Sequence, residues 1–138
     1  MLKNINNQAD FSVKDFRTLK VYQKSIELAD ALFQLAKNFP PEEKYGITSQ
    51  ILRSSSSIGA NIAEGAGQGY KSRTINFCNI AMGSANETRH WIMIAKMRGY
   101  INEKQFKKLD NCLDEILKML IGYMRMVQAQ INQENNCA

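Results

Sequence analysis

Between Phe106 and Val127, apolar residues recur at alternating steps of three and four positions, without a break over three heptads. The members of this stripe are Phe106, Leu109, Leu113, Ile116, Leu120, Tyr123 and Val127. Such spacing places every member on one face of an α-helix, which has about 3.6 residues per turn. A helix with a face this long needs partner helices to cover it, so the chain is constrained to a helical assembly.

Three further segments show helical periodicity, and strand formers are scarce. Valine occurs at only three positions, and both prolines stand together at Pro40 and Pro41, so the remaining segments lack the strongest helix breaker. We expect helices over about 19–38, 47–66, 72–98 and from 103 onward. Thr18 is the predicted N-cap of the first helix, Gly99 ends the third, and Asn102 with Gln105 fits a capping box for the fourth. Short turns between long helices predict an all-α, up-down-up-down four-helix bundle.

Helical spacing also predicts core stripes for the first and third helices. The stripe of the first helix is Tyr22, Ile26, Ala29, Phe33 and Ala36, and that of the third is Phe77, Ala81, Ala85, Thr88, Ile92 and Ala95.

The third and fourth helices carry more apolar residues than one stripe needs. Additional apolar residues flank the stripes of the third and fourth helices and predict an oligomer interface. These residues are Ile80, Met82, Trp91, Met93, Cys112, Met119 and Met126. Alternatively, crossing angles and ragged helix ends cover them within one chain.

The chain of 138 residues is expected to form one domain. We expect a flexible N-terminal segment over residues 1–15, the bundle over 16–131 and a frayed C-terminal tail over 132–138. No apolar run approaches the roughly 20 residues of a membrane span, and the N-terminus has no secretory signal. Three widely spaced cysteines favour free thiols, and therefore a cytoplasmic protein.

The sequence lacks residues that the known catalytic and metal-binding motifs require. Glu87 and His90 form one Glu-x-x-His pair, but a di-iron site needs a second pair and His90 is the only histidine. The segment GAGQGYKS (65–72) is similar to a phosphate loop, but Tyr70 interrupts the required Gly-Lys-Ser order and a helix precedes it. No second histidine is available to activate the serines at 54–57 or a cysteine. We therefore expect no enzyme, no cofactor and no metal.

The net charge of +5 favours anionic partners such as nucleic acid, although it is also an ordinary solubility charge. Two groups of cations are candidate phosphate contacts, with solvated surface charge as the alternative for each. The first group is Arg53, Lys71 and Arg73, near the second turn, and the second is Arg17, Lys20 and Lys24, at the start of the first helix. A third cluster, Lys104, Lys107 and Lys108, opens the fourth helix at the opposite end of such a bundle.

Three stretches carry a family resemblance, namely FRTLKVYQKSIELA (16–29), FPPEEKYGITSQILRSSSSIGANIAEGAG (39–67) and FCNIAMGSANE (77–87). In this order they resemble the four-helix-bundle proteins encoded in intervening sequences of bacterial 23S rRNA genes. The similarity covers roughly residues 16–127, and NIAEG (61–65) is among its most specific pieces. The chain departs from the family at Gln68, where arginine is usual, and near Tyr70 and Arg73, where a serine and an acidic residue are common.

The resemblance implies a homopentameric ring without known enzymatic activity, associated with nucleic acid or a ribonucleoprotein. Family members also resemble the accessory variability protein of diversity-generating retroelements, a basic pentamer that partners a reverse transcriptase. Two functions of different class follow. One is a non-catalytic homo-oligomer that associates with RNA or DNA through basic groups. The other is a structural ring that binds a protein partner, such as a reverse transcriptase.

Overall fold

The computed structural model describes residues 15–137. In this range the chain forms four α-helices and two short 3-10 helices, and no residue of the range is in a strand, which confirms the predicted all-α fold. The elements are η1 (Phe16–Thr18), α1 (Lys20–Ala36), η2 (Pro41–Glu43), α2 (Ile47–Ala66), α3 (Lys71–Met97) and α4 (Glu103–Cys137). Apart from Asp15, the segment 1–15 that was expected to be flexible lies outside the described residues.

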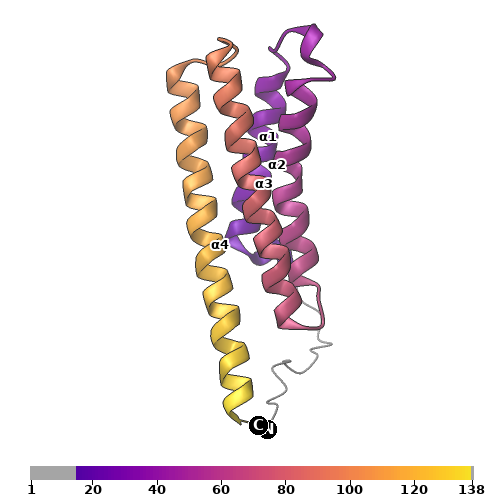
Figure 1. Ribbon diagram of the computed structural model, residues 1–138, viewed down its shortest axis with the longest axis vertical. Helices are drawn as coiled ribbons and strands as arrows, with labels where there is room; N and C mark the ends of the chain where they lie inside the picture. The colour runs from indigo at the N-terminus through magenta and orange to yellow at the C-terminus, as the bar shows by residue number, and fades with distance from the viewer. Residues whose placement is uncertain (1–14, 138) are drawn as a thin grey trace.

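The four helices run side by side along the long axis of the molecule (Figure 1). The α1–α2 and α3–α4 connections lie at one end, and the α2–α3 connection lies at the other. Helix α1 contacts α2 and α4, and α3 contacts the same two helices, so the four helices form a square array. Helix α4 has 35 residues, and its C-terminal turns extend past the α2–α3 connection (Figure 1).

Local capping signals set several helix ends where the sequence predicts them. Helix α2 has the predicted bounds. Before α4, the backbone N–H of Asn102 donates to Gln105 Oε1 at 2.9 Å, and the backbone N–H of Gln105 donates to Asn102 Oδ1 at 2.8 Å. Gly99 follows α3 with a φ of 78°, in the left-handed region that glycine adopts without strain. The capping box and the glycine stop are therefore confirmed.

Two boundaries differ from the prediction. Thr18 is not the N-cap of α1, because the residues before Leu19 already form η1, which the side chain of Asp15 caps by accepting from the N–H of Arg17 at 3.0 Å. The C-terminal boundary also differs, because residues 132–137 continue α4 as regular helix. Glu134 pairs there with Lys71 of α3, a contact between residues 63 positions apart that no local pattern reveals.

Of the predicted core stripe of α1, Ala36 is buried as expected, but the rest of the buried face lies one residue earlier than predicted. The buried residues of this helix are Val21, Ser25, Leu28, Leu32 and Ala36. Ile26 and Phe33 are instead 46% and 49% exposed. Two apolar stripes with the same spacing run along α1, about 100° apart, so spacing alone does not choose between them. Small residues decide the rotation, because a Cβ at Gly59 of α2 would lie 2.9 Å from Ser25 Oγ.

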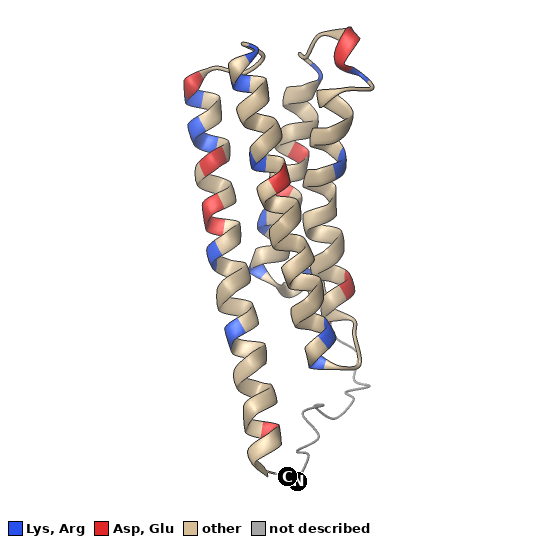
Figure 2. Ribbon diagram, viewed as in Figure 1, with Lys and Arg blue, Asp and Glu red and all other residues tan. Residues whose placement is uncertain are grey.

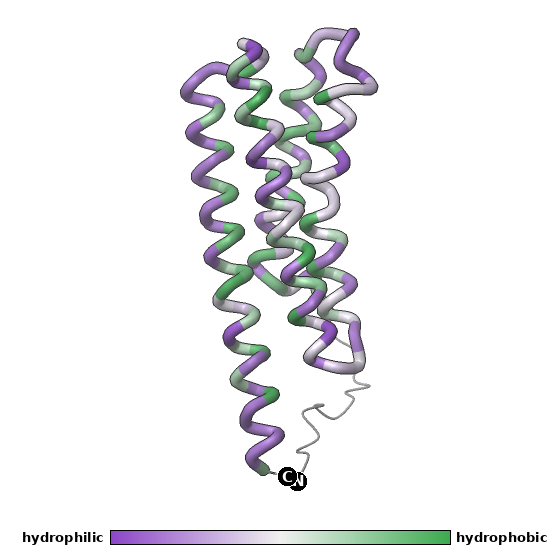
Figure 3. Tube along the Cα trace, in the orientation of Figure 1, coloured by the Kyte–Doolittle hydropathy of each residue, from purple (hydrophilic) through white to green (hydrophobic). Residues whose placement is uncertain are grey.

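The other helices bury the faces that their spacing predicts. Within the α4 stripe, Phe106 and Tyr123 are partly buried and the remaining members are buried. Five of the six predicted core residues of α3 are buried, and Cys78 takes the buried position expected for Phe77. Hydrophobic segments alternate with polar ones along every helix (Figure 3). The core therefore runs the length of the four-helix array.

The predicted oligomer-interface residues fall into two classes. Ile80, Met93 and Met126 are 52%, 50% and 50% exposed. The others are partly buried and pack against the core of the same chain. These are Met82, Trp91, Cys112 and Met119. Packing within one chain, the alternative left open by the sequence, thus accounts for much of the burial of the second class.

Candidate nucleic-acid interface

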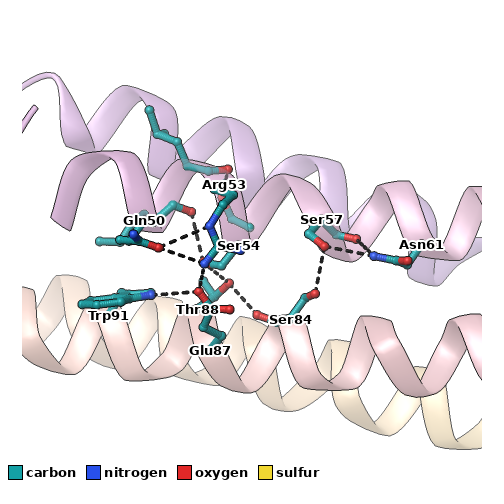
Figure 4. A network of polar contacts seen from close by, with 12 residues as sticks. Gln50, Arg53, Ser54, Ser57, Asn61, Ser84, Glu87, Thr88 and Trp91 are labelled. Carbon is teal, nitrogen blue, oxygen red and sulfur yellow. Dashed lines mark hydrogen bonds and ion pairs between the residues drawn. The ribbon is translucent and has the colours of Figure 1, made fainter. Parts of the chain in front are cut away.

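Arg53, the first candidate cation, lies on α2 within a polar network that joins α2 to α3 (Figure 4). Its guanidinium forms an ion pair with Glu87 and donates to Gln50 Oε1 at 2.9 Å. The indole Nε1 of Trp91 donates to the same Glu87 carboxylate at 3.0 Å. The Arg53 side chain remains 56% exposed. A neighbouring carboxylate therefore neutralises much of its charge, which weakens its attraction for phosphate.

The same network continues along α2 and α3 as a row of small polar residues (Figure 4). Ser57 Oγ and Ser84 Oγ are 2.9 Å apart, and Asn61 Nδ2 donates to the backbone carbonyl of Ser57 at 2.8 Å. Thr88 Oγ1 donates to Ser54 Oγ at 3.0 Å, and both residues are fully buried. These hydroxyls satisfy one another between closely packed helices, so the serine run of α2 fixes its register against α3.

Lys71 and Arg73, at the start of α3, have different surroundings. The Lys71 side chain is 16% exposed and forms an ion pair with Glu134 of α4. Arg73 is exposed, and its side chain forms no ion pair with any residue of the range 15–137. Arg73 also lies far from Arg53, because Glu87, the partner of Arg53, is about 21 Å further along α3. The structure thus does not bring the first candidate group together.

The second candidate group is also largely paired. Arg17 Nε lies 2.8 Å from Asp15 Oδ1, and this hydrogen bond raises the pKa of Arg17 and lowers that of Asp15. Lys24 pairs with Glu115 of α4, and hydrogen bonding to that carboxylate raises the pKa of the lysine. Lys20 is exposed and makes no ion pair within the described part of the chain. Four of the six candidate cations therefore already have a carboxylate partner.

The outer face of α4 carries an open row of cations that extends the third cluster noted in the sequence, which was not among the candidate phosphate contacts. Its members are Lys104, Lys107, Lys108, Lys118 and Arg125, and all are exposed. Lys107 lies 4.0 Å from Glu103, and the other four form no ion pair with the residues described here. Figure 2 shows basic positions on α4 with acidic positions between them, and no basic position near the C-terminal end of the helix. We call this row the α4 basic stripe.

Acidic residues of α4 pair with cations of α3 and α1 instead of with Lys104, Lys108, Lys118 or Arg125. Asp110 and Asp114 accept hydrogen bonds from Arg89 of α3 at 2.7 Å and 2.6 Å, and Glu115 pairs with Lys24 of α1. The signal for the stripe is present in the sequence. Positions 104, 108, 118 and 125 share a face of the helix away from the apolar stripe, and the same face carries Glu115, whose carboxylate pairs with Lys24.

The residues in the range 15–137 also bear on metal binding and membrane insertion. No group of three or more histidine, cysteine and acidic side chains in this range could hold a metal ion. The ring of His90 packs edge-on against Trp91, with 4.7 Å between ring centroids. Among the helices described, none combines the length and the hydropathy that a bilayer crossing demands.

Comparison with known proteins identifies the family to which this four-helix chain belongs. Residues 17–122 match the model of the family described as 23S rRNA-intervening sequence protein. The chain belongs to this family. A crystal structure of a protein with unknown function from the S23 ribosomal protein family of Bacteroides thetaiotaomicron VPI-5482 is similar, with 38% sequence identity and a TM-score of 0.71. The match covers 76% of this chain and 95% of that one. A comparison with curated proteins finds no match. The predicted family is therefore confirmed.

Proposed function

We propose that this protein is a non-catalytic homo-oligomer that binds RNA or DNA through phosphate contacts made by the α4 basic stripe. The observation that carries the proposal is the state of these cations. Lys104, Lys108, Lys118 and Arg125 are exposed and form no ion pair within residues 15–137, and they span about 32 Å of helix. The net charge of +5 agrees with an anionic partner of this class.

The chemistry of the stripe favours backbone contacts over base reading. Lysine and arginine side chains neutralise phosphates and release counterions, which gives affinity that is tolerant of sequence. The stripe has no aromatic member on which an unpaired base could stack. We therefore expect micromolar binding without base preference.

Self-assembly would multiply these contacts. We propose that the helices alternate in an up-down-up-down order and that the bundle assembles into a closed ring, with a pentamer as the size that the family resemblance implies. The exposed apolar side chains of Ile80, Met93 and Met126 support such assembly. Each copy would add one basic stripe, and linked weak contacts gain affinity through their effective concentration.

Titration with fluorescent single-stranded RNA at two salt concentrations tests the proposal. A triple variant of the stripe, Lys108→Ala/Lys118→Ala/Arg125→Ala, is compared with Lys37→Ala/Lys44→Ala/Arg98→Ala, which removes the same charge from exposed positions outside both candidate groups and the stripe. We expect the stripe variant to lose at least about tenfold in affinity and about two units of salt slope, because three phosphate contacts are lost. The matched variant should stay close to wild type.

Two outcomes would contradict the proposal. Equal losses in both triple variants would show that net charge, and not the stripe, governs binding. If wild type shows no salt-sensitive binding at about 50 mM salt, the nucleic-acid function is wrong. The protein-interaction ring, with a partner such as a reverse transcriptase, would then be the better explanation of the family fold.

A further inference from the structure

We propose that copies of this chain join through two different surfaces, with Ile80 on α3 of one copy entering a hollow between α1 and α2 of the next. This inference rests on the self-association in the proposed function and assigns its two contact surfaces. A contact between unlike surfaces repeats around an axis and closes into a ring, whereas a contact between like surfaces stops at a dimer.

The first surface is an uncharged hollow on the outer side of α1 and α2. A cavity of about 340 Å³ lies there, and none of its lining residues is charged. Helix α2 contributes only small residues, namely Ser55, Ser56, Gly59, Ala60 and Ala63. Ile26 of α1 stands at the edge with 46% of its surface exposed. The small side chains of α2 thus leave room for a larger apolar group from outside.

The second surface surrounds Ile80. This residue is 52% exposed, and the segment of α3 from Thr74 to Asn86 contains no charged residue. Ile80 lies one turn before Ser84, which bonds to Ser57 of α2, so it lies on the side of the bundle that α2 and α3 share. An isolated exposed isoleucine needs no explanation by itself. Its level along the bundle, however, matches that of the hollow.

The α2–α3 contacts fix this level. Ser57 and Ser84 bond across the two helices, and Gly65 lies against Phe77, so the chain directions of α2 and α3 are opposed. Ile80 lies four residues before Ser84 on α3, and Asn61 lies four residues after Ser57 on α2. Because the two helices run in opposite directions, Ile80 and Asn61 lie at the same level. Ile80 is therefore level with the Gly59–Ala63 part of the hollow, within about 3 Å. If neighbouring copies are related by rotation about an axis parallel to the helices, each residue keeps its height along that axis. Two surfaces at the same height can then meet without a shift of one copy along the axis.

The charges beside the two surfaces are complementary. Glu64 follows the hollow on α2, and Arg73 precedes Ile80 on α3. Both are exposed, and neither side chain forms an ion pair with a residue in the part of the chain described. By the same count along the helices, Arg73 lies about 6 Å from the level of Glu64, within reach of an arginine side chain. The carboxylate of one copy and the guanidinium of the next can therefore pair at the edge of the contact.

The two surfaces also point in suitable directions for closure. The hollow lies on the α1–α2 side of the square array, and Ile80 lies on the adjoining α2–α3 side. Adjoining sides of a square face roughly at right angles, so each contact turns the chain of subunits through a large angle. Such a turn favours a small closed ring over an extended filament.

The test uses two single variants, Ile80→Asp and Ala60→Asp, and measures mass by light scattering. Each variant should be a monomer of 15.7 kDa, because each has lost one of the two surfaces. Mixed in equal amounts, they should form a dimer of twice that mass and nothing larger. The Ile80→Asp chain still offers an intact hollow, and the Ala60→Asp chain still offers Ile80. Met97→Asp, at an 80% exposed position of α3 away from both surfaces, should keep the wild-type mass.

Each alternative result overturns the inference in a distinct way. If wild type is itself a monomer, self-association fails and the contact fails with it. If wild type is an oligomer and Ile80→Asp keeps its mass, the contact is wrong while self-association stands. If both variants are helical monomers that do not combine when mixed, like surfaces meet instead of unlike ones. RNA titration is a separate measurement, so a failure of nucleic-acid binding leaves these results unaffected.

Discussion

The two interfaces of helix α3 and the interface between α1 and α4 are built in opposite ways. Against α2, the backbones approach so closely that a Cβ at Gly65 would lie 2.8 Å from Phe77 Cβ and 3.2 Å from the carbonyl oxygen of Thr74. Against α4, Arg89 bonds to two carboxylates. Between α1 and α4, by contrast, a cavity of about 300 Å³ remains, with a mainly apolar lining that includes Leu28, Ala31, Leu109 and Cys112.

The α2–α3 and α3–α4 interfaces therefore fix the relative positions of their helices, whereas the α1–α4 interface constrains them less. Interdigitated small residues and directed hydrogen bonds permit one register, so α3 determines how α2 and α4 are placed. Helix α1 meets α4 through apolar side chains and the partly exposed Lys24–Glu115 pair, which constrain geometry less. Substitutions that add volume should therefore be harmful at the α3 interfaces and tolerated between α1 and α4.

The largest expected effect comes from adding volume at Gly65. Gly65→Val should cost about 3 kcal/mol of unfolding free energy, because the new side chain meets a Cβ and a backbone carbonyl that cannot move independently. Gly122→Val, on α4, is the matched control, since a Cβ there has no neighbour within 4 Å. It should change stability by less than about 0.5 kcal/mol. Urea denaturation measures both, and similar losses would show that the α2–α3 interface is not especially tight.

Much of this fold could be predicted from the sequence, because the decisive signals are local. The α4 stripe, the capping box at Asn102 and the glycine stop at Gly99 depend on residues within one or two turns. The face of α1 could not be predicted in the same way. Two stripes of equal spacing compete there, and the choice depends on the fit of Ser25 against Gly59 of another helix.

The candidate binding residues were harder to predict for a related reason. A cation is available to phosphate only if no carboxylate already pairs with it, and the partners of Arg53, Lys71 and Lys24 come from other helices. Sequence distance hides these pairs. The α4 basic stripe was predictable in position, since its spacing is helical. Its openness was not, because it depends on Arg89 of α3 and Lys24 of α1 binding the acidic residues of α4.

The second prediction compares two thiols. Cys78 is a buried residue of α3, and Cys112 lines the cavity between α1 and α4. Cys78 is fully buried, and burial raises the pKa of its thiol from 9.0 to about 11. The thiol is neutral in both states below pH 9, so its contribution to stability is fully present there. As pH rises from 9 toward 11, the unfolded chain loses the proton while the folded chain keeps it. Folding stability should therefore fall by about 2 kcal/mol over this range.

Urea denaturation of wild type and Cys78→Ala between pH 8 and about pH 11 isolates this contribution. The stability advantage of wild type over Cys78→Ala should shrink as pH rises, since the variant lacks the titrating group. Cys112→Ala serves as the control. Burial also raises the pKa of Cys112, but this thiol lines the α1–α4 cavity and is only partly buried. An advantage over Cys78→Ala that stays constant with pH would show that the Cys78 thiol is not isolated from water.

The smallest expected effect tests the open interface directly. Ala31→Leu places a larger apolar side chain at the α1–α4 cavity, where the lining is mainly apolar and about 300 Å³ is free. It should raise the unfolding free energy by about 0.5 to 1 kcal/mol, because apolar area is buried without displacing a neighbour. Ala129→Leu, at an exposed position of α4 outside the cavity lining, has a similar helix propensity change and should be nearly neutral. If Ala31→Leu instead destabilises the protein as strongly as Gly65→Val, the α1–α4 interface is as closely packed as those of α3, and the contrast between them is wrong.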